Sequence, residues 1–346
     1  MKIAVGMSGG IDSSTTALLL KEEGHDVIGV TMFLFEHQTS EIEHAKLVCE
    51  KLKIPHFVMD YREAFQNHVI SEFIKTYEAG HTPNPCIRCN CLFKYGQLID
   101  DVKALGADAF STGHYAKIQF NQDSKEFEIH MAVNRRKDQS YNLFHLSQET
   151  LAMLHFPLGD VKSKDSVRDI FQSVNIETAK KKDSLGICFI EHKQHELYLN
   201  SANSSAMKSG EIVDKSGKFL GYHQGIAGYT VGQKKGLPER ESGKYVTIGI
   251  DAAKNQVIVG DEADLIKFSI KSNDFSFISN HQKLPLEVSV KVSQWSTIYA
   301  GKLYALSASE TLIQFKEPVR APALGQAVVC YEGTKLIGGG TIHKAD

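Results

Sequence analysis

The fold is decided by the stretch Lys2-Ile3-Ala4-Val5-Gly6-Met7-Ser8-Gly9-Gly10-Ile11-Asp12-Ser13-Ser14. Its apolar first half predicts a short strand, and the Ser-Gly-Gly turn leads into a helix through residues 18–20. Glycines let a backbone turn sharply and approach a phosphate, and the amides at the start of the next helix donate hydrogen bonds to it. No lysine follows the glycines, so the stretch is not a GxxxxGKS/T phosphate loop. Its glycines also lack the GxGxxG spacing of a dinucleotide-binding loop. An ordinary strand–helix turn is the alternative, and the polar residues at the helix start make it the weaker interpretation.

Strand-like and helix-like segments alternate outward from this stretch through the first half of the chain. The predicted strands cover residues 27–35, 56–59 and 109–112, and the predicted helices cover residues 42–52 and 64–77. Gly24 is placed where a glycine ends a helix, and Ser40 with Glu43 forms a capping-box pattern. Such alternation predicts a mostly parallel sheet with helices on both faces, which is an α/β, Rossmann-like arrangement.

The pattern changes after about residue 190. A polar Ser/Asn stretch at residues 200–210 is typical of a linker, and short β segments broken by glycines follow it. They cover residues 218–221, 228–231, 246–250 and 256–259. From residue 270 onward only strands and turns are predicted, among them residues 286–292 and 326–331. This half of the chain is therefore expected to hold a small mixed region and an all-β, barrel-like domain.

Composition is typical of a soluble globular protein with two or three domains. The chain has 346 residues, of which 42% are hydrophobic and 23% charged, and its net charge is −2. A charge this small provides no general attraction for nucleic acid, so any such binding has to use local basic patches. The longest nearly apolar run, residues 27–35, is far shorter than the ~20 residues of a membrane helix, and the N-terminus lacks the pattern of a signal peptide. We therefore expect a cytoplasmic protein with no membrane partner.

The six cysteines are too few for a disulfide scaffold at this length, and their close spacing favours catalysis or metal binding. Three of them lie in the segment Thr82-Pro83-Asn84-Pro85-Cys86-Ile87-Arg88-Cys89-Asn90-Cys91. The prolines and Asn84 are expected to hold this segment out of regular structure. Arg88 and Lys94 lie close enough in sequence to lower a thiol pKa if their charges face it. Cys188 has an apolar Ile-Cys-Phe context, for which simple burial is the ordinary interpretation.

Several motifs in a fixed order extend the argument from single residues to a family. They are SGGIDS (residues 8–13), PNPCIRCN (83–90), STGHYA (111–116), KDQSY (137–141), DSLGICF (183–189) and YTVGQKKGL (229–237). The first resembles the loop of the N-type PP-loop ATP pyrophosphatases, which bind ATP and release pyrophosphate. Together the motifs closely resemble the tRNA-specific 2-thiouridylase family (MnmA/TrmU type) over essentially the whole chain. The resemblance implies a PP-loop domain over residues 1–199, a small central domain over 200–262 and a C-terminal β-barrel over 263–346.

The same resemblance assigns the residues that would carry the chemistry. It implies that ATP adenylates the C2 oxygen of the wobble uridine, since this oxygen is a poor leaving group until it becomes part of AMP. A persulfide on Cys188 would deliver the sulfur and Cys89 would be the catalytic nucleophile, with a transient Cys89–Cys188 disulfide at turnover. Asp12 would help to hold Mg²⁺ on the pyrophosphate. The implied ATP-binding residues are Gly6, Met7, Ser8, Gly9, Gly10, Ile11, Asp12, Ser13, Met32 and Gly113, although core packing is the commoner role of a strand methionine such as Met32.

Contacts with tRNA are also implied, because base chemistry needs the wobble uridine out of its stack. The expected partners are the anticodon stem-loop of a tRNA and a sulfur donor such as a cysteine desulfurase or a sulfur-relay protein. The implied tRNA-binding residues are Asn84, Pro85, Cys86, His114, Lys137, Asp138, Gln139 and Gln326. The family often has an Arg-Tyr pair in the barrel that grips the anticodon stem. This chain has KVSQWS there (residues 291–296), so those contacts are not carried over.

Cys86 departs from the family, in which Asp is common at this position. Cys86, Cys89 and Cys188 could instead hold three corners of an iron–sulfur cluster, as in related PP-loop tRNA thiolases, whereas a zinc site would want a second CxxC or a His pair. The persulfide route is favoured, because family members with Asp here work without that thiol. Two further alternatives are a PP-loop enzyme that adenylates a different base and a non-enzymatic ATP-binding module. The second would leave the cysteine motifs without a role.

Overall fold

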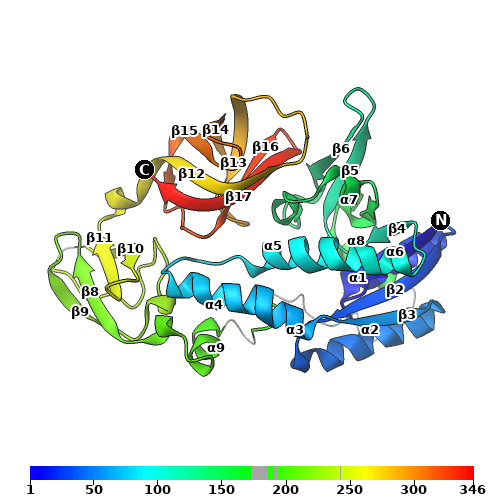
Figure 1. Cartoon of the computed structure of the whole chain (residues 1–346), viewed down its shortest axis with the longest axis horizontal. Coiled ribbons are helices and arrows are strands. Elements are labelled where there is room, and N and C mark those ends of the chain that lie inside the picture. Colours follow the sequence, from blue (N-terminus) through cyan, green and yellow to red (C-terminus); the bar gives the residue numbers. More distant parts are fainter. Residues whose placement is uncertain (173–185, 191–193, 242) are drawn as a thin grey trace.

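The computed structural model describes the chain except residues 173–185, 191–193 and 242. Figure 1 shows an α/β part that contains the N-terminus, a small sheet at the opposite end of the long axis, and a β-barrel over the helices between them. The predicted class, with a parallel N-terminal sheet, a small mixed part and a C-terminal barrel, is confirmed. No helix among the described residues has both the length and the apolar character needed to cross a membrane.

The N-terminal sheet has five parallel strands in the order β3-β2-β1-β4-β7. Neighbouring residues of a strand point to opposite faces, so Ile3 and Val5 pack in one apolar core and Ala4 packs in the other. The strands are β1 (Lys2–Gly6), β2 (Asp26–Phe33), β3 (His56–Asp60), β4 (Ala109–Ser111) and β7 (Leu154–His155). One face is covered by α1 (Ile11–Glu22), α2 (Thr39–Leu52) and α8 (Lys164–Gln172), and the other by helical segments from α3 to α6.

Those segments form two long rods that contact each other. The first rod is α3 (Arg62–Phe65), the π-helix η2 (Gln66–Ile70) and α4 (Ser71–Glu78), which confirms the helix predicted for residues 64–77. The second rod is α5 (Pro85–Cys89), the π-helix η3 (Asn90–Gln97) and α6 (Leu98–Ala104). The two rods lie side by side in Figure 1. Arg88 Nε of the second rod donates to the carbonyl oxygen of His68 in the first at 2.9 Å.

Of the two predicted helix boundaries, one is confirmed and one is wrong. Gly24 has φ +86° just beyond the end of α1, a conformation that a glycine adopts without strain. The capping box at Ser40 does not form, because α2 already begins at Thr39, after the 3₁₀ turn η1 (Glu36–Gln38). The side chain of Gln38 bonds the backbone of Met32 and Leu34, at 2.9 and 2.8 Å, and so fixes the chain before Ser40 is reached.

The central sheet has the order β10-β11-β8-β9 and is mixed, because β8 and β11 are parallel and the other pairs are antiparallel. Its strands are β8 (Gly210–Asp214), β9 (Phe219–His223), β10 (Val246–Asp251) and β11 (Gln256–Gly260), with α9 (His195–Ser201) and η8 (Ser205–Met207) before them. The strand predicted for residues 228–231 is wrong. Residues Ile226–Gly228 form the 3₁₀ turn η9, and Gln233 Nε2 holds the following loop by donating to the carbonyl oxygen of Gly228 at 2.9 Å.

The C-terminal barrel closes because its first strand also pairs with its last. Its strands are β12 (Ile266–Phe277), β13 (Leu286–Lys291), β14 (Tyr299–Ala305), β15 (Thr311–Arg320), β16 (Ala327–Glu332) and β17 (Lys335–Ala345), preceded by η10 (Glu262–Leu265). A hairpin of the α/β part, β5 (Ala116–Asn121) and β6 (Glu126–Met131), extends this sheet through a pairing of β6 with β17. The remaining short elements are η4 (Ser140–Leu143), α7 (Gln148–Leu151) and η5 (Pro157–Asp160).

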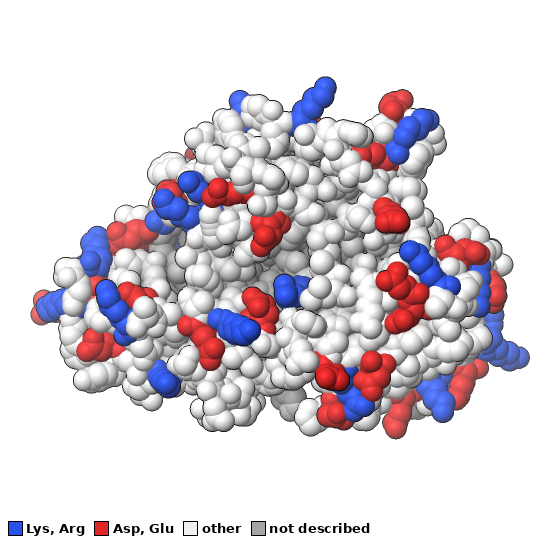
Figure 2. Space-filling model, viewed as in Figure 1, with Lys and Arg blue, Asp and Glu red and all other residues white. Residues whose placement is uncertain are grey.

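Basic and acidic side chains are interspersed over the face shown in Figure 2, and neither sign forms a large continuous patch there. This distribution agrees with the net charge of −2. Long-range attraction is therefore weak over this face, and a polyanion has to be held by specific contacts rather than by a general field.

Candidate active site

The predicted phosphate loop follows β1 at the carboxyl edge of the parallel sheet. Gly9 has φ +70°, and a Cβ there would lie 2.5 Å from the carbonyl oxygen of Glu41 in α2. Ser13 Oγ accepts from the amide of Ser8 at 3.2 Å and donates to the carbonyl oxygen of Gly10 at 3.1 Å. The loop is thus closed by its own residues. It leads directly into α1, whose first backbone amides are available to bind an anion.

Two other predicted ATP-binding residues lie at the same edge of the sheet. Gly113 follows β4, and a Cβ there would lie 2.8 Å from the carbonyl carbon of Asp12 and from the amide nitrogen of Ser13. Only glycine therefore fits against the phosphate loop at this point. Met32 is half-buried near the end of β2, the strand next to β1.

Asp12 is engaged by two residues that the sequence did not reveal. Both carboxylate oxygens lie 2.6 Å from Lys164 Nζ at the start of α8, and Oδ1 also accepts from the hydroxyl of Tyr115 at 2.8 Å. The Lys164 side chain is only 10% exposed. The helix dipole disfavours a lysine in the first turn of a helix, so the unfavourable position of Lys164 is a sequence signal for a role outside the helix. In this conformation, both carboxylate oxygens of Asp12 are paired with Lys164, and the role of Asp12 at a Mg²⁺ site stays a prediction.

The cysteine segment is helical where the sequence predicted irregular structure. Residues 81–84 are irregular, but Pro85 begins α5, and the side chain of Asn84 accepts from the amide of Ile87 at 3.4 Å. Proline suits the first position of a helix because its missing N–H would be unpaired there, and Asn is a favourable N-cap. Cys86 and Cys89 consequently lie one turn apart on the same side of α5.

Cys188 is brought to these cysteines by the aromatic residue beside it. Phe189 contacts Phe65 and Phe73 edge-on, with ring centroids 5.7 and 5.4 Å apart. Phe189 and Cys89 also pack against the same apolar core. Cys188 is an exposed residue, but its thiol is desolvated and lies close enough to Cys89 and Cys86 for thiolates there to oppose its ionisation.

The expected lowering of the thiol pKa values is wrong. Loss of surrounding water raises the pKa of Cys89 to about 11 and that of Cys188 to about 12, and it outweighs the opposing charge of Lys94. Arg88 turns its Nε toward the carbonyl oxygen of His68, and its charge acts on Cys91 instead. Within the described residues, no group of three His, Cys, Asp or Glu side chains is arranged to hold a metal ion.

Tyr95 connects the cysteine rod to the phosphate loop. Its hydroxyl lies 3.1 Å from Thr112 Oγ1 and 2.9 Å from His114 Nδ1, and these two residues flank Gly113. Burial lowers the pKa of His114 well below its ordinary value, so its imidazole is neutral. One short loop therefore separates the nucleotide edge of the sheet from the rod that carries Cys89.

The KDQ motif lies in a loop that is partly buried. Asp138 is 4% exposed and accepts from the amide of Ala132 and the hydroxyl of Ser140, both at 2.9 Å, so its carboxylate holds the loop rather than facing solvent. Gln139 Oε1 accepts from the amide of Tyr115 at 3.0 Å, and Lys137 is half-buried.

The barrel docks onto both loops that carry predicted tRNA-binding residues. Gln326 Nε2 donates to the carbonyl oxygens of Thr82 and Pro83 at 3.1 and 3.0 Å. Gln294 Nε2 donates to the carbonyl oxygen of Asp138 at 2.9 Å, a contact that the sequence did not reveal. We call these two contacts, together with the hydrogen bond from Tyr141 to the Ala327 carbonyl (2.7 Å), the barrel dock. Through this dock, Gln326 contacts Thr82 and Pro83, the two residues that precede Asn84 in the chain.

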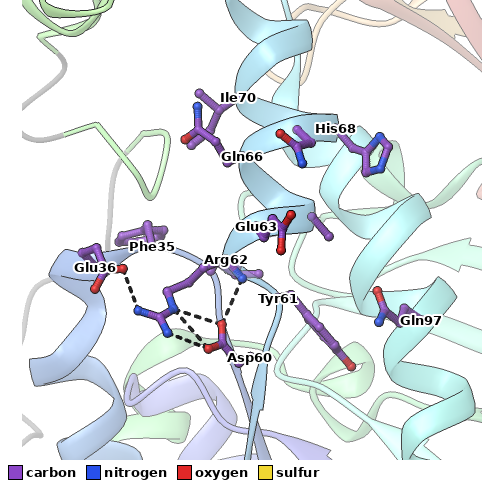
Figure 3. Close-up of a pocket in the computed structure, with 13 residues that line it drawn as sticks. Phe35, Glu36, Asp60, Tyr61, Arg62, Glu63, Gln66, His68, Ile70 and Gln97 are labelled. Atoms are coloured by element: carbon purple, nitrogen blue, oxygen red, sulfur yellow. Dashed lines mark hydrogen bonds and ion pairs between the residues drawn. The ribbon is translucent and has the colours of Figure 1, made fainter.

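A cleft next to the first rod is lined by none of the predicted site residues. It has a volume of about 930 Å³ and lies where β2 and β3 end, next to the first rod. Figure 3 shows Arg62 between Asp60 and Glu36, and its guanidinium pairs with both carboxylates at 2.6 Å. These two ion pairs compensate the charge of Arg62, so its guanidinium is not a free cation in the cleft.

Comparison with known proteins gives consistent matches along the chain. Three family models match in succession: "tRNA methyl transferase HUP domain" over residues 1–192, "tRNA methyl transferase PRC-barrel domain" over 199–261 and "Aminomethyltransferase beta-barrel domain" over 267–342. A solved structure of a predicted subunit of a tRNA methyltransferase from Methanocaldococcus jannaschii aligns with 50% of this chain and 74% of that chain, at 15% identity and a TM-score of 0.30, too low to support any argument.

Two curated relatives are similar over their full length. The tRNA-specific 2-thiouridylase MnmA of Pelobacter propionicus is 39% identical, over 100% of this chain and 98% of the relative. The protein of the same name from Clostridium botulinum is 39% identical, over 99% of this chain and 98% of the relative. With similarity of this extent, and with a phosphate loop and paired cysteines in the order described, the chain belongs to the MnmA family of tRNA-specific 2-thiouridylases.

Proposed function

We propose that this protein is an ATP-dependent sulfurtransferase that converts the wobble uridine of tRNA into 2-thiouridine. The observation that carries the proposal is that Tyr95, which lies on the same helical rod as Cys89, contacts Thr112 and His114, whose neighbour Gly113 abuts the phosphate loop. An activating nucleotide and a sulfur-carrying thiol can then act on one base. The names of the full-length relatives support the same activity.

In the first half-reaction the C2 oxygen of the uridine attacks the α-phosphate of ATP, and pyrophosphate leaves. Residues 6–13 hold the pyrophosphate part through loop amides, Gly113 allows the close approach, and Met32 contacts the adenine. Mg²⁺, when bound, neutralises phosphate charge. Asp12 could contribute to that site only after releasing Lys164, whose ammonium is itself suited to a phosphate oxygen.

In the second half-reaction sulfur replaces AMP at C2. Cys188 carries the sulfur as a persulfide, whose terminal sulfur attacks C2 and displaces AMP. Cys89 then attacks the Cys188 sulfur, which releases the 2-thiouridine and leaves a Cys89–Cys188 disulfide. Both thiols are protonated at pH 7 in this conformation, because their pKa values are raised to about 11 and about 12. Lys94 is the nearby cation that favours their thiolates.

In this proposal, the tRNA lies where the barrel dock joins the loops at residues 82–84 and 137–141. Asn84, Pro85 and Cys86 border the flipped base, and His114, Lys137, Gln139 and Gln326 contact the anticodon stem-loop, with Asp138 as a support of its loop. The domain boundaries that we propose are residues 1–199, 200–262 and 263–346. We place the reaction in the cytoplasm, with a cysteine desulfurase or a sulfur-relay protein as the donor.

The test is a reconstituted reaction with ATP, Mg²⁺, unmodified tRNA and a persulfide donor. The expected products are 2-thiouridine by nucleoside mass spectrometry, together with AMP and pyrophosphate. The Cys188→Ser variant should release pyrophosphate and yield no 2-thiouridine, because a serine cannot carry sulfane sulfur. ADP and phosphate as the nucleotide products, or unthiolated tRNA with the wild-type protein, would refute the proposal.

A further inference from the structure

The active-site helix of this chain carries a second thiol that the two half-reactions leave unused. Cys86 is exposed and lies three residues before Cys89 in the same turn of α5. In a helix, Cα atoms three residues apart are separated by about 5 Å, which is within the range that a disulfide spans. Their Cβ atoms are about 5–6 Å apart, so the first turn of α5 has to loosen slightly for the bond to close. The N-cap bond of Asn84 holds the start of this turn in place.

Cys86 also belongs electrostatically with the two reacting thiols. A thiolate at Cys86 opposes the ionisation of both Cys89 and Cys188, and Lys94 favours the thiolate at all three positions. Cys91 is different, because its neighbouring cation is Arg88 on the other side of the helix. Cys86, Cys89 and Cys188, whose thiolates are all favoured by Lys94, therefore form a set of thiols that can exchange disulfide bonds. Cys91 does not belong to this set.

We propose that Cys86 exchanges into the disulfide left by each turnover, so that the bond moves from Cys89–Cys188 to Cys86–Cys89. This inference rests on the proposed function. The Cys86 thiolate attacks the Cys89 sulfur, the Cys89–Cys188 bond breaks, and its electron pair leaves on Cys188, which becomes a thiolate. One disulfide is consumed and one is formed, so this step needs no oxidant or reductant.

The exchange has a purpose that follows from where each cysteine lies. Cys188 has to accept a new sulfane sulfur before every turnover, and a disulfide to Cys89 blocks it. Moving the bond onto one turn of α5 frees Cys188 at once. An external dithiol then reduces the Cys86–Cys89 bond through Cys86, which is an exposed residue.

The experiment is a single turnover without reductant, with Cys188 loaded with one equivalent of persulfide and unmodified tRNA in excess. The reaction is quenched near neutral pH with an excess of N-ethylmaleimide, which blocks free thiols before the disulfides can exchange further, and the protein is then digested with trypsin. Cleavage after Arg88 separates Cys86 from Cys89, so the two disulfides give different cross-linked peptides. The expected result is 2-thiouridine in the tRNA, a Cys86–Cys89 disulfide as the major cross-link, and an alkylated Cys188.

Two variants complete the test. Thiolated tRNA made by Cys86→Ser should be accompanied only by the Cys89–Cys188 disulfide, whatever the rate of that variant. Cys91→Ser is the matched control, since Cys91 shares the tryptic peptide of Cys89, and it should show the wild-type pattern. Wild-type protein that makes 2-thiouridine and retains the Cys89–Cys188 disulfide, with Cys86 alkylated, would overturn the exchange alone. A sample with no 2-thiouridine would overturn the proposed function and the exchange with it.

Discussion

The phosphate loop and the barrel dock are both parts of the site, but they are built in opposite ways. The phosphate loop is closed by bonds between residues no more than five positions apart, such as Ser8 to Ser13 and Ser13 to Gly10. The barrel dock joins residues that are 156 to 244 positions apart, from Gln294 to Asp138 and from Gln326 to Thr82. The first can therefore form from its own sequence, whereas the second exists only when the whole chain has folded.

Because of this contrast, the proposed use of ATP and the proposed binding of tRNA can be tested separately. Damage to the phosphate loop should remove ATP turnover, and tRNA binding should remain. Damage to the barrel dock should weaken tRNA binding and leave ATP binding unchanged. The following variants test that separation, beginning with the one of largest expected effect.

Gly113→Ala should lower the rate of pyrophosphate release at least on the order of 100-fold. The new Cβ would lie 2.8 Å from backbone atoms of Asp12 and Ser13, so the phosphate loop has to shift. Gly249→Ala is the matched control, because its nearest neighbour is the tip of Ile258 at 3.9 Å. Steady-state kinetics and thermal melting measure both. Turnover close to wild type in Gly113→Ala would mean that the nucleotide does not use this edge.

Lys164→Ala should lower pyrophosphate release by on the order of tenfold, since it leaves the partly buried carboxylate of Asp12 without its ion pair. Arg168→Ala removes an exposed ion pair to Asp165 from the same helix and should have little effect. Titration of Mg²⁺ in both variants is the measurement. Because Asp12 is then free to bind Mg²⁺, the variant should need no more Mg²⁺ than the wild type, and pyrophosphate release at the wild-type rate would contradict the prediction.

Gln326→Ala should raise KM for tRNA about fivefold, with KM for ATP unchanged, because it removes two hydrogen bonds that position Thr82 and Pro83. Gln314→Ala, an exposed glutamine of the same barrel, is the control. Both constants come from the same initial-rate assay. Equal changes in the two constants would show that the dock also shapes the nucleotide edge.

Sequence predicted the parts that depend on short-range geometry. The strand, the Ser-Gly-Gly turn and the helix start are each encoded by adjacent residues, and the alternating elements predicted the parallel sheet. The residues that were missed, Lys164, Tyr115 and Gln294, act through contacts more than 100 positions away. The helix that begins at Pro85 was not predicted for another reason. Proline breaks a helix in its interior but is favourable at its first position, and the sequence alone does not show which of the two applies to Pro85.

The long-range dock also has a consequence for synthesis on the ribosome. Ser140 and Tyr141 are buried against Tyr331 and the Ala327 carbonyl, partners that lie 191 and 186 positions later in the chain. At roughly 5–20 residues per second, these two side chains wait on the order of 10–40 s after they are made before those partners are polymerised. During that interval the nascent α/β part can close its phosphate loop, but the platform for tRNA is incomplete. A half-made chain thus contains the residues of the phosphate loop before it contains both sides of the barrel dock.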